Sequence, residues 1–224
     1  MSHYLQPKGG AIKLKQRANN TLSVFLCGED YMVSIEFSDF KFYRINPEYL
    51  EYLHTFDSEV YYDASYKENM KPFIGILIGI EDYKYFIPLT SPKAKHKKWS
   101  NVADEHILIY EIANIDTYVK GHYYKPYNTK EKLHLIGVLD IKKMIPVPRD
   151  VFKVINFSDC SREYRSLLEK EYEFCLSRQK EIVRSVNNLY NKYLNGVNVK
   201  FSCNYKLLEK VCQNYIDKEI DLDL

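Results

Sequence analysis

The chain has 224 residues, of which 46% are hydrophobic and 28% charged, so its composition is that of a folded globular protein and not of a disordered chain. Its formal net charge of +2 excludes the strong overall basicity of many nucleic-acid-binding proteins, so any such partner must be recognised by local clusters of charge. A chain of this length supports one large core, and we expect one main domain.

Cysteine spacing and hydropathy exclude several classes of protein. The five cysteines are an odd number and no two form a CxxC pair, so neither a disulfide framework nor a zinc knuckle is indicated. No segment approaches the roughly 20 apolar residues of a membrane span, and the first residues lack the apolar core of a secretory signal. We therefore expect a cytoplasmic protein with no cofactor, no metal and no membrane partner.

The first 40 residues differ from the rest and are interpreted as an N-terminal extension of unknown role. They contain two expected strands, "TLSVFL" and "YMVSIEF". Residues 41–220 form the expected main domain.

A short helix is predicted in "NPEYLEYLHTF". Asn46 can accept hydrogen bonds from the first free backbone amides, and Pro47 suits the first helical position. Tyr49, Leu53 and Phe56 recur at helical spacing, so this face of the helix is expected to point inward.

The middle of the chain predicts a mostly antiparallel sheet. After a Tyr-rich loop, "VYYDASYKENMK", the β-branched and aromatic runs from Phe73 to Ile80 and from Tyr83 to Leu89 predict a hairpin. "EHILIYEI" and "LHLIGVLDIKKMIPVP" predict further strands, joined by a long connection that contains tyrosines and lysines.

The last third of the chain is predicted to be helical. Leu168, Cys175, Ile182 and Leu189 recur every seven residues, which predicts one long helix or two helices broken within it, ending before Gly196. A short final helix is predicted in "NYKLLEKVCQNYI", with Asn204 as its cap. The expected fold class is α+β.

A basic stretch, "PLTSPKAKHKKW", follows the predicted hairpin. Between Asp82 and Asp104 the chain has no acidic residue but five lysines. Lysines of this kind bind phosphates, and aromatic rings stack on unpaired bases. The alternative is a solvated turn that discourages edge pairing of the strand.

The same stretch offers groups for RNA cleavage. Without a metal, an enzyme must deprotonate a 2′-hydroxyl, stabilise a phosphorane and protonate the leaving oxygen. Lys93 can supply positive charge or a proton, and Thr90 and Ser91 can donate hydrogen bonds to phosphate oxygens. From these residues alone, the alternative that the hydroxyls satisfy a β-turn before Pro92 stays open.

Four segments, in this order and spacing, resemble the ToxN/AbiQ endoribonucleases, the toxins of type III toxin–antitoxin systems. They are "FYRINPEYLEYLHTFD", "KPFIGILIGIEDYKYFIPLTSPKAKH", "IGVLDIKKMIPVP" and "CNYKLLEKVCQNY". The resemblance implies a compact, twisted antiparallel sheet with a barrel-like core, as in the MazF and CcdB toxins, elaborated with helices that include a long C-terminal one.

It also implies a metal-independent, sequence-preferring endoribonuclease that leaves a 2′,3′-cyclic phosphate. The implied partners are cellular or phage RNA substrates and a small structured antitoxin RNA, which is cut from a tandem-repeat transcript and closes with the toxin into a cyclic assembly. A role in abortive phage infection is implied for some members.

The resemblance assigns catalytic roles to Thr90, Ser91 and Lys93, assisted by Lys71 and by Tyr66, with Tyr62 as the alternative to Tyr66. The side chains expected to bind RNA are Tyr49, Lys95, His96, Lys97, Lys98, Lys142 and Lys143. His96 is also placed for acid–base work, since an imidazole titrates near neutrality, with an exposed loop residue as the alternative.

Two competing functions remain at this point. The first is a non-catalytic RNA-binding module, which cleavage products would distinguish from a nuclease. The second is a MazF-like toxin neutralised by a protein. A small acidic reading frame beside the gene would indicate a protein antitoxin, whereas a short tandem repeat upstream would indicate an RNA antitoxin.

Overall fold

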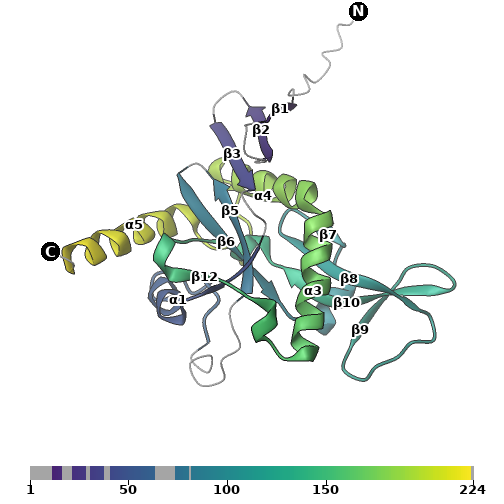
Figure 1. The fold of residues 1–224 in the computed structure, drawn as a ribbon. Coiled ribbons are helices and arrows are strands. Elements are labelled where there is room, and N and C mark those ends of the chain that lie inside the picture. Colours follow the sequence, from purple (N-terminus) through teal and green to yellow (C-terminus); the bar gives the residue numbers. More distant parts are fainter. Residues whose placement is uncertain are drawn as a thin grey trace, which may run out of the picture.

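The computed structural model describes residues 12–16, 22–28, 31–37, 41–63, 74–80 and 82–222. In this part of the chain, nine strands form one curled antiparallel sheet, and helices pack around it (Figure 1). The expected α+β class with a curled antiparallel sheet is confirmed. No helix in the described part is long and apolar enough to cross a bilayer.

The nine-stranded sheet is ordered as follows: β12 (Phe152–Val154), β4 (Phe42–Ile45), β5 (Ile74–Ile80), β6 (Tyr83–Thr90), β10 (Glu131–Leu139), β8 (His106–Asn114) and β7 (Val102–Ala103), with β9 (Tyr123–Pro126) paired to β10 and β11 (Ile145–Pro146) paired to β6. Strand β9 lies in the long connection where no strand was expected. Before the sheet, β1 (Ile12–Gln16), β2 (Leu22–Gly28) and β3 (Tyr31–Phe37) form a separate antiparallel sheet. The two expected strands β2 and β3 are confirmed, and β1 was not foreseen.

The predicted hairpin is the centre of the fold. Ile80 of β5 pairs with Tyr83 of β6, and the ladder continues to Gly75 and Pro88. Most apolar side chains of both strands are buried, since helices pack around the curled sheet. At Gly75 the approach is close, since a Cβ there would lie 2.1 Å from the carbonyl oxygen of Ile87.

The predicted first helix is confirmed as α1 (Pro47–His54), and the Asn46 side chain accepts from the backbone N–H of Glu48 at 3.0 Å. Leu53 is fully buried as expected. Phe56 is not, because the helix ends before it and its side chain is 48% exposed.

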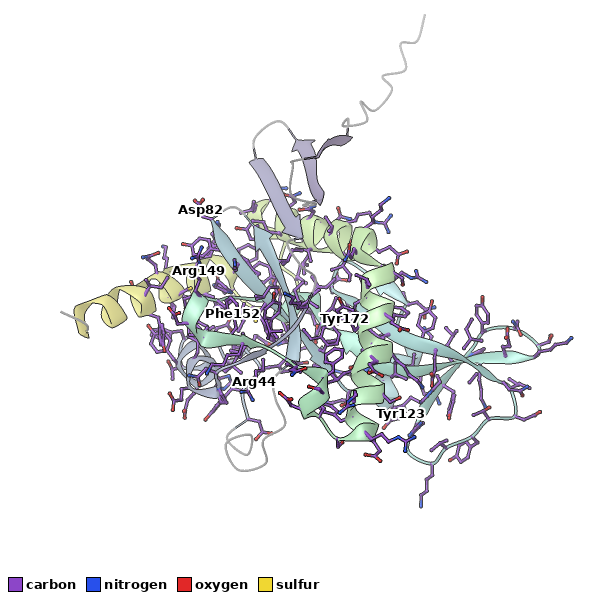
Figure 2. The ribbon with its side chains drawn as sticks, in the orientation of Figure 1. Arg44, Asp82, Tyr123, Arg149, Phe152 and Tyr172 are labelled. Carbon is purple, nitrogen blue, oxygen red and sulfur yellow. The ribbon has the colours of Figure 1, made fainter. Side chains whose placement is uncertain are left out.

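The C-terminal third forms two helices and then a third. These are α3 (Arg162–Ser177), α4 (Gln179–Leu194) and α5 (Tyr205–Leu222). The helical run breaks at Arg178, yet all four residues of the seven-residue repeat are buried. Helix α3 crosses β8 and β10, and its Tyr172 packs edge-on against Phe42 of β4 (Figures 1 and 2). Helix α5 extends to Leu222 and is longer than predicted, although Asn204 caps it as expected.

A buried carboxylate joins the sheet to the last two helices. Glu209 of α5 is 5% exposed and accepts hydrogen bonds from the hydroxyls of Tyr85 (2.6 Å) and Tyr190 (2.8 Å). Lys206 lies 3.0 Å from the same carboxylate. Because a charge buried in apolar surroundings is costly without such partners, this network specifies how α4 and α5 dock on β6.

We predict that Tyr85→Phe lowers the free energy of unfolding by about 1–3 kcal/mol, because it removes a donor from a buried carboxylate. Tyr190→Phe should have a similar effect. The loss of unfolding free energy in the double variant should differ from the sum of the two single losses, because both hydroxyls donate to the same oxygen atom. Urea denaturation measures all three. Full stability in both single variants would contradict this role for Glu209.

Candidate functional site

The expected catalytic residues leave the sheet at a junction between two of its strands. Most of β6 pairs with β5, but its last two residues pair with β10, with Leu89 opposite Leu139 and Thr90 opposite Val138. Thr90 is therefore half-buried, whereas Ser91 and Lys93 are exposed immediately beyond it. Thr90, Ser91 and Lys93 therefore lie within four consecutive residues at the end of β6, and their catalytic roles stay predictions.

The segment after Lys93 is a 3-10 helix, η1 (Ala94–Lys98), and Lys93 is its N-terminal cap residue. The backbone N–H of His96 donates to the Lys93 carbonyl at 2.9 Å, and His96 Nδ1 accepts from the backbone N–H of Lys93, also at 2.9 Å. Because Nδ1 accepts, the imidazole is neutral and carries its proton on Nε2. The His96 ring therefore fixes the backbone of the proposed catalytic lysine.

The expectation that His96 is either an exposed loop residue or a group that touches RNA is corrected by its burial. Its side chain is 4% exposed. Burial lowers the pKa of His96 to about 4, and the nearby charges of Lys95, His106 and Lys93 lower it further in the same direction. A neutral, buried ring can position Lys93 but offers no charge to a phosphate.

Trp99 joins the two basic clusters that were separate in the sequence. Its ring centroid lies 4.4 Å from those of His96 and of His106. Lys95 Nζ lies 5.3 Å and Lys142 Nζ 5.7 Å from the same ring, so both ammonium groups gain a cation–π contact. The basic run after β6 and the lysine after β10 therefore form one surface, which we call the Trp99 cluster: Lys95, Trp99 and Lys142.

Lys143 does not belong to this surface, although it was expected to bind RNA. It is 8% exposed, its Nζ donates to the Glu59 carbonyl at 2.7 Å, and it forms an ion pair with the Glu59 carboxylate. A buried ammonium that is already neutralised would need to break these interactions to reach a phosphate.

Tyr49 was also expected to bind RNA, and the structure places it in the core. Its side chain is fully buried and its hydroxyl donates to the Pro146 carbonyl at 2.9 Å. Burial raises its pKa far above the ordinary range of a phenol. Tyr49 therefore supports the sheet behind the site.

The structure describes only some of the remaining residues that were expected at the site. Tyr66 and Lys71 lie outside the described residues, so their roles stay predictions. Tyr62, the alternative to Tyr66, is half-buried and its ring centroid lies 5.6 Å from that of His54. Lys97 and Lys98 are exposed on η1, as expected of phosphate-binding lysines.

Asp140 and Tyr61 form a polar contact beside the site that sequence reasoning missed. Asp140 is 4% exposed, its backbone N–H donates to the Pro88 carbonyl at 3.0 Å, and its Oδ2 accepts from the Tyr61 hydroxyl at 2.9 Å. Burial raises the pKa of the Asp140 carboxyl, against the opposing effects of the Tyr61 hydrogen bond and of Lys142. The contact attaches Tyr61, five residues before Tyr66 in the sequence, to the end of β10.

Lys125 is a second residue that sequence reasoning missed. From β9, its Nζ donates to the Trp99 carbonyl at 2.5 Å and to Asn101 Oδ1 at 2.6 Å. Burial lowers the pKa of this ammonium group. Nothing in the sequence distinguishes Lys125 from other lysines of the long connection, whereas Asp140 was detectable as the acid in an apolar and basic run.

The arrangement suits chemistry on a phosphodiester. Thr90 and Ser91 carry hydroxyls that can donate to phosphate oxygens, Lys93 follows two residues later, and the lysines of η1 raise the local positive potential. Among the described residues, no three His, Cys, Asp or Glu side chains form a metal-binding group. The Lys93 ammonium group is a donor with no acceptor lone pair, so it attracts phosphate and repels a cation.

Comparison with known proteins shows what this chain is similar to. The family model for the toxin ToxN of type III toxin–antitoxin systems matches residues 41–213. The chain is 30% identical over 178 residues to a protein named Endoribonuclease ToxN from Pectobacterium atrosepticum, across 78% of this chain and 93% of that protein.

Two solved structures have a similar fold. One belongs to a bacterial antiviral system that a processed non-coding RNA regulates; it is 26% identical, with a TM-score of 0.62 over 78% of this chain and 98% of that chain. The other concerns type III systems with selective toxin inhibition by a non-coding RNA pseudoknot; it is 26% identical, with a TM-score of 0.57 over 80% of this chain and 98% of that chain.

We predict that His96 makes stability depend on pH. Its folded pKa of about 4 lies below its ordinary value of 6.5, so the unfolded chain binds the proton first and the free energy of unfolding falls as the pH drops from 6.5 towards 4. His96→Asn keeps an oxygen near the position of Nδ1 but does not titrate, so its stability should fall less over this range.

Chemical denaturation of both proteins across this range isolates His96, because every other group titrates in both. Parallel pH profiles for wild type and His96→Asn would show that the imidazole is not held neutral by the fold.

Proposed function

Because the chain belongs to the ToxN family of toxins from type III toxin–antitoxin systems, we propose that it is an endoribonuclease whose activity an RNA antitoxin holds in check. The observation that carries the proposal is the exposed turn at the end of β6. It holds Thr90, Ser91 and Lys93 within four residues of the chain, directly before the η1 segment that carries Lys95 and leads to Trp99.

The proposed reaction is an internal transesterification. The 2′-hydroxyl oxygen attacks the adjacent phosphorus, the bond from phosphorus to the 5′-oxygen breaks, and the products are a 2′,3′-cyclic phosphate and a 5′-hydroxyl. The proton lost by the 2′-hydroxyl is matched by the proton that the leaving 5′-oxygen gains. Lys93 stabilises the phosphorane or transfers a proton, and Ser91 and Thr90 hold the non-bridging oxygens.

Residues that the structure does not describe complete the proposed site. Lys71 and Tyr66 follow Tyr61 in the sequence by ten and five residues, and the Asp140 contact attaches Tyr61 next to β10. A second positive group facing Lys93 would stabilise charge on the phosphorane from the opposite side. The assistance by Lys71 and Tyr66 is therefore part of the proposal.

The reaction as proposed needs no metal ion and prefers particular RNA sequences. The hydroxyl and ammonium groups of the turn supply the charge stabilisation and proton transfer that a metal supplies in other nucleases. Sequence preference requires contacts with base edges, which are most accessible in unpaired RNA.

The proposed inhibitor is a small structured RNA derived from a tandem-repeat transcript, which closes with the toxin into a cyclic assembly. Support comes from the two similar structures, one from a system regulated by a processed non-coding RNA and one from systems inhibited by an RNA pseudoknot. The first of these is an antiviral system, so we propose that phage infection is the setting in which this toxin acts.

We predict that Lys93→Ala and Ser91→Ala each lower kcat for RNA cleavage by about 100-fold or more, because each removes a group that acts on the scissile phosphate. Both side chains are exposed, so the free energy of unfolding should not change. Lys97→Ala, also exposed on the same segment, is the matched control and should keep kcat. The assay is run in EDTA, with mass spectrometry of the 3′ ends.

Two outcomes would contradict the mechanism. Folded Lys93→Ala and Ser91→Ala proteins that cleave at the wild-type rate would remove the catalytic assignment. Cleavage that stops in EDTA and returns with a divalent ion would show that a metal takes part.

We predict that the η1 lysines set the salt dependence of RNA binding. Replacing Lys95, Lys97 and Lys98 together by Gln should reduce the slope of log affinity against log salt by up to about 0.7 for each lysine that neutralises a phosphate in the wild type. The control replaces three exposed lysines on other elements, Lys153, Lys180 and Lys210, by Gln. Equal slopes for the η1 variant and wild type would mean that this run is a solvated turn.

A further inference from the structure

One part of the sheet extends away from the helices. The end of β8, strand β9, the start of β10 and their connecting loops form an arm, residues 112–131 (Figure 1). Of the ten large hydrophobic residues that are exposed in the described part of the chain, five belong to this arm: Ile112, Ile115, Tyr118, Val119 and Tyr127. Such a concentration on one projection marks a surface that a partner covers.

We propose that this arm is a second RNA-binding surface, which takes up unpaired nucleotides of the RNA that occupies the cleavage site. The inference rests on the proposed function, because it assumes that RNA is the ligand. It adds a second place on the protein where that RNA is held, beyond the turn after β6.

The loop at the tip of the arm has a defined shape that exposes its apolar residues. The Thr117 N–H donates to the Asn114 carbonyl at 3.0 Å, and the His122 N–H donates to the Val119 carbonyl at 3.1 Å. Between these turns Tyr118 is 75% exposed. Because the loop is internally bonded, the tyrosine is presented to solvent at little further cost in conformational entropy on binding.

Rings stacked at the base of the loop make the arm a platform for a planar ligand. The rings of His122 and His134 lie 4.7 Å apart with an angle of 6° between them, and the ring of Tyr124 lies 5.0 Å from that of His134. Lys132 Nζ lies 4.6 Å from the Tyr124 ring and donates to the Ile115 carbonyl at 2.6 Å. The exposed His122 ends this stack, where a nucleobase can extend it.

Charge favours RNA over a second protein as the occupant. Residues 112–131 contain Lys120, Lys125 and Lys130 against Asp116 and Glu131, and Lys132 follows directly. Four lysines against two carboxylates, interleaved with tyrosines and His122, match a polyanion with aromatic bases, whereas a protein interface is usually depleted in lysine.

The arm is continuous with the proposed cleavage site. Lys125 joins β9 to the Trp99 carbonyl and to Asn101, at the end of η1. Tyr123, at the base of the arm (Figure 2), packs into the small cluster around Leu108 and Leu135 with Trp99. Lys125 therefore links the arm to the Trp99 cluster, and the nearby Glu111 carboxylate is paired with His134 and Lys170.

The test measures binding of a short, fluorescent single-stranded 2′-O-methyl oligoadenylate, which cannot be cleaved because its 2′-oxygens are blocked. The arm variant is Tyr118→Ala with Tyr127→Ala, and its control is Phe56→Ala with Leu176→Ala, which removes two exposed apolar side chains elsewhere. We expect affinity to fall about tenfold or more in the arm variant, the effect of losing stacked bases, and not in the control. The same strand in a duplex should bind the wild type more weakly.

Cleavage assays separate this proposal from the proposed function. The arm variant should raise KM for a long RNA and leave kcat at saturation unchanged. If wild type cleaves RNA but the arm variant binds oligoadenylate as tightly as wild type, the arm proposal alone fails. If wild type neither cleaves nor binds RNA, the proposed function fails with it.

Light scattering tests the remaining occupant, a second copy of the chain. A wild type that self-associates without RNA, together with a monomeric arm variant of unchanged RNA affinity, would overturn the proposal and identify the arm as a protein interface.

Discussion

Strand β6 is shared by two halves of the sheet, and the position of the proposed active site depends on this sharing. Tyr85 and Phe86 pair with β11, whereas only Leu89 and Thr90 pair with β10 on the same side. The chain therefore leaves the sheet close to the point where β10 and β11 both lie beside β6. The buried β5–β6 hairpin precedes this point in the chain, and an exposed turn follows it. A turn anchored in this way keeps its hydroxyl and ammonium groups exposed while their backbone is held, which is the preorganisation that charge stabilisation requires.

The lysines around this junction differ in what neutralises them. Lys143 is buried against Glu59, and the ion pair holds a connecting segment in place. Lys95 and Lys142 lie over the Trp99 ring, which attracts an ammonium group without cancelling its charge. Lys143 thus stabilises the fold, whereas the adjacent Lys142 contributes positive potential. The basic surface therefore contains fewer lysines than the sequence suggests.

The elements that could be predicted from the sequence are those whose conformation depends on residues close to them in the chain. The hairpin, the Asn46 cap and the seven-residue repeat through Ile182 depend on spacing, and the structure contains all of them. The burial of Tyr49 and Lys143 depends on partners far along the chain, Pro146 and Glu59, so spacing could not reveal it. The same reason hid Lys125, whose partners belong to a segment 24 and 26 residues away.

The proposed mechanism requires that the turn after β6 holds the scissile phosphate. A crystal structure of the protein with an RNA in which 2′-O-methyl groups block the attacking oxygens tests it most directly. We expect one phosphate within hydrogen-bond distance of the Thr90 or Ser91 hydroxyl and of Lys93 Nζ, with the neighbouring RNA backbone along the Trp99 cluster. RNA bound on another face, with water alone around Ser91 and Lys93, would contradict it.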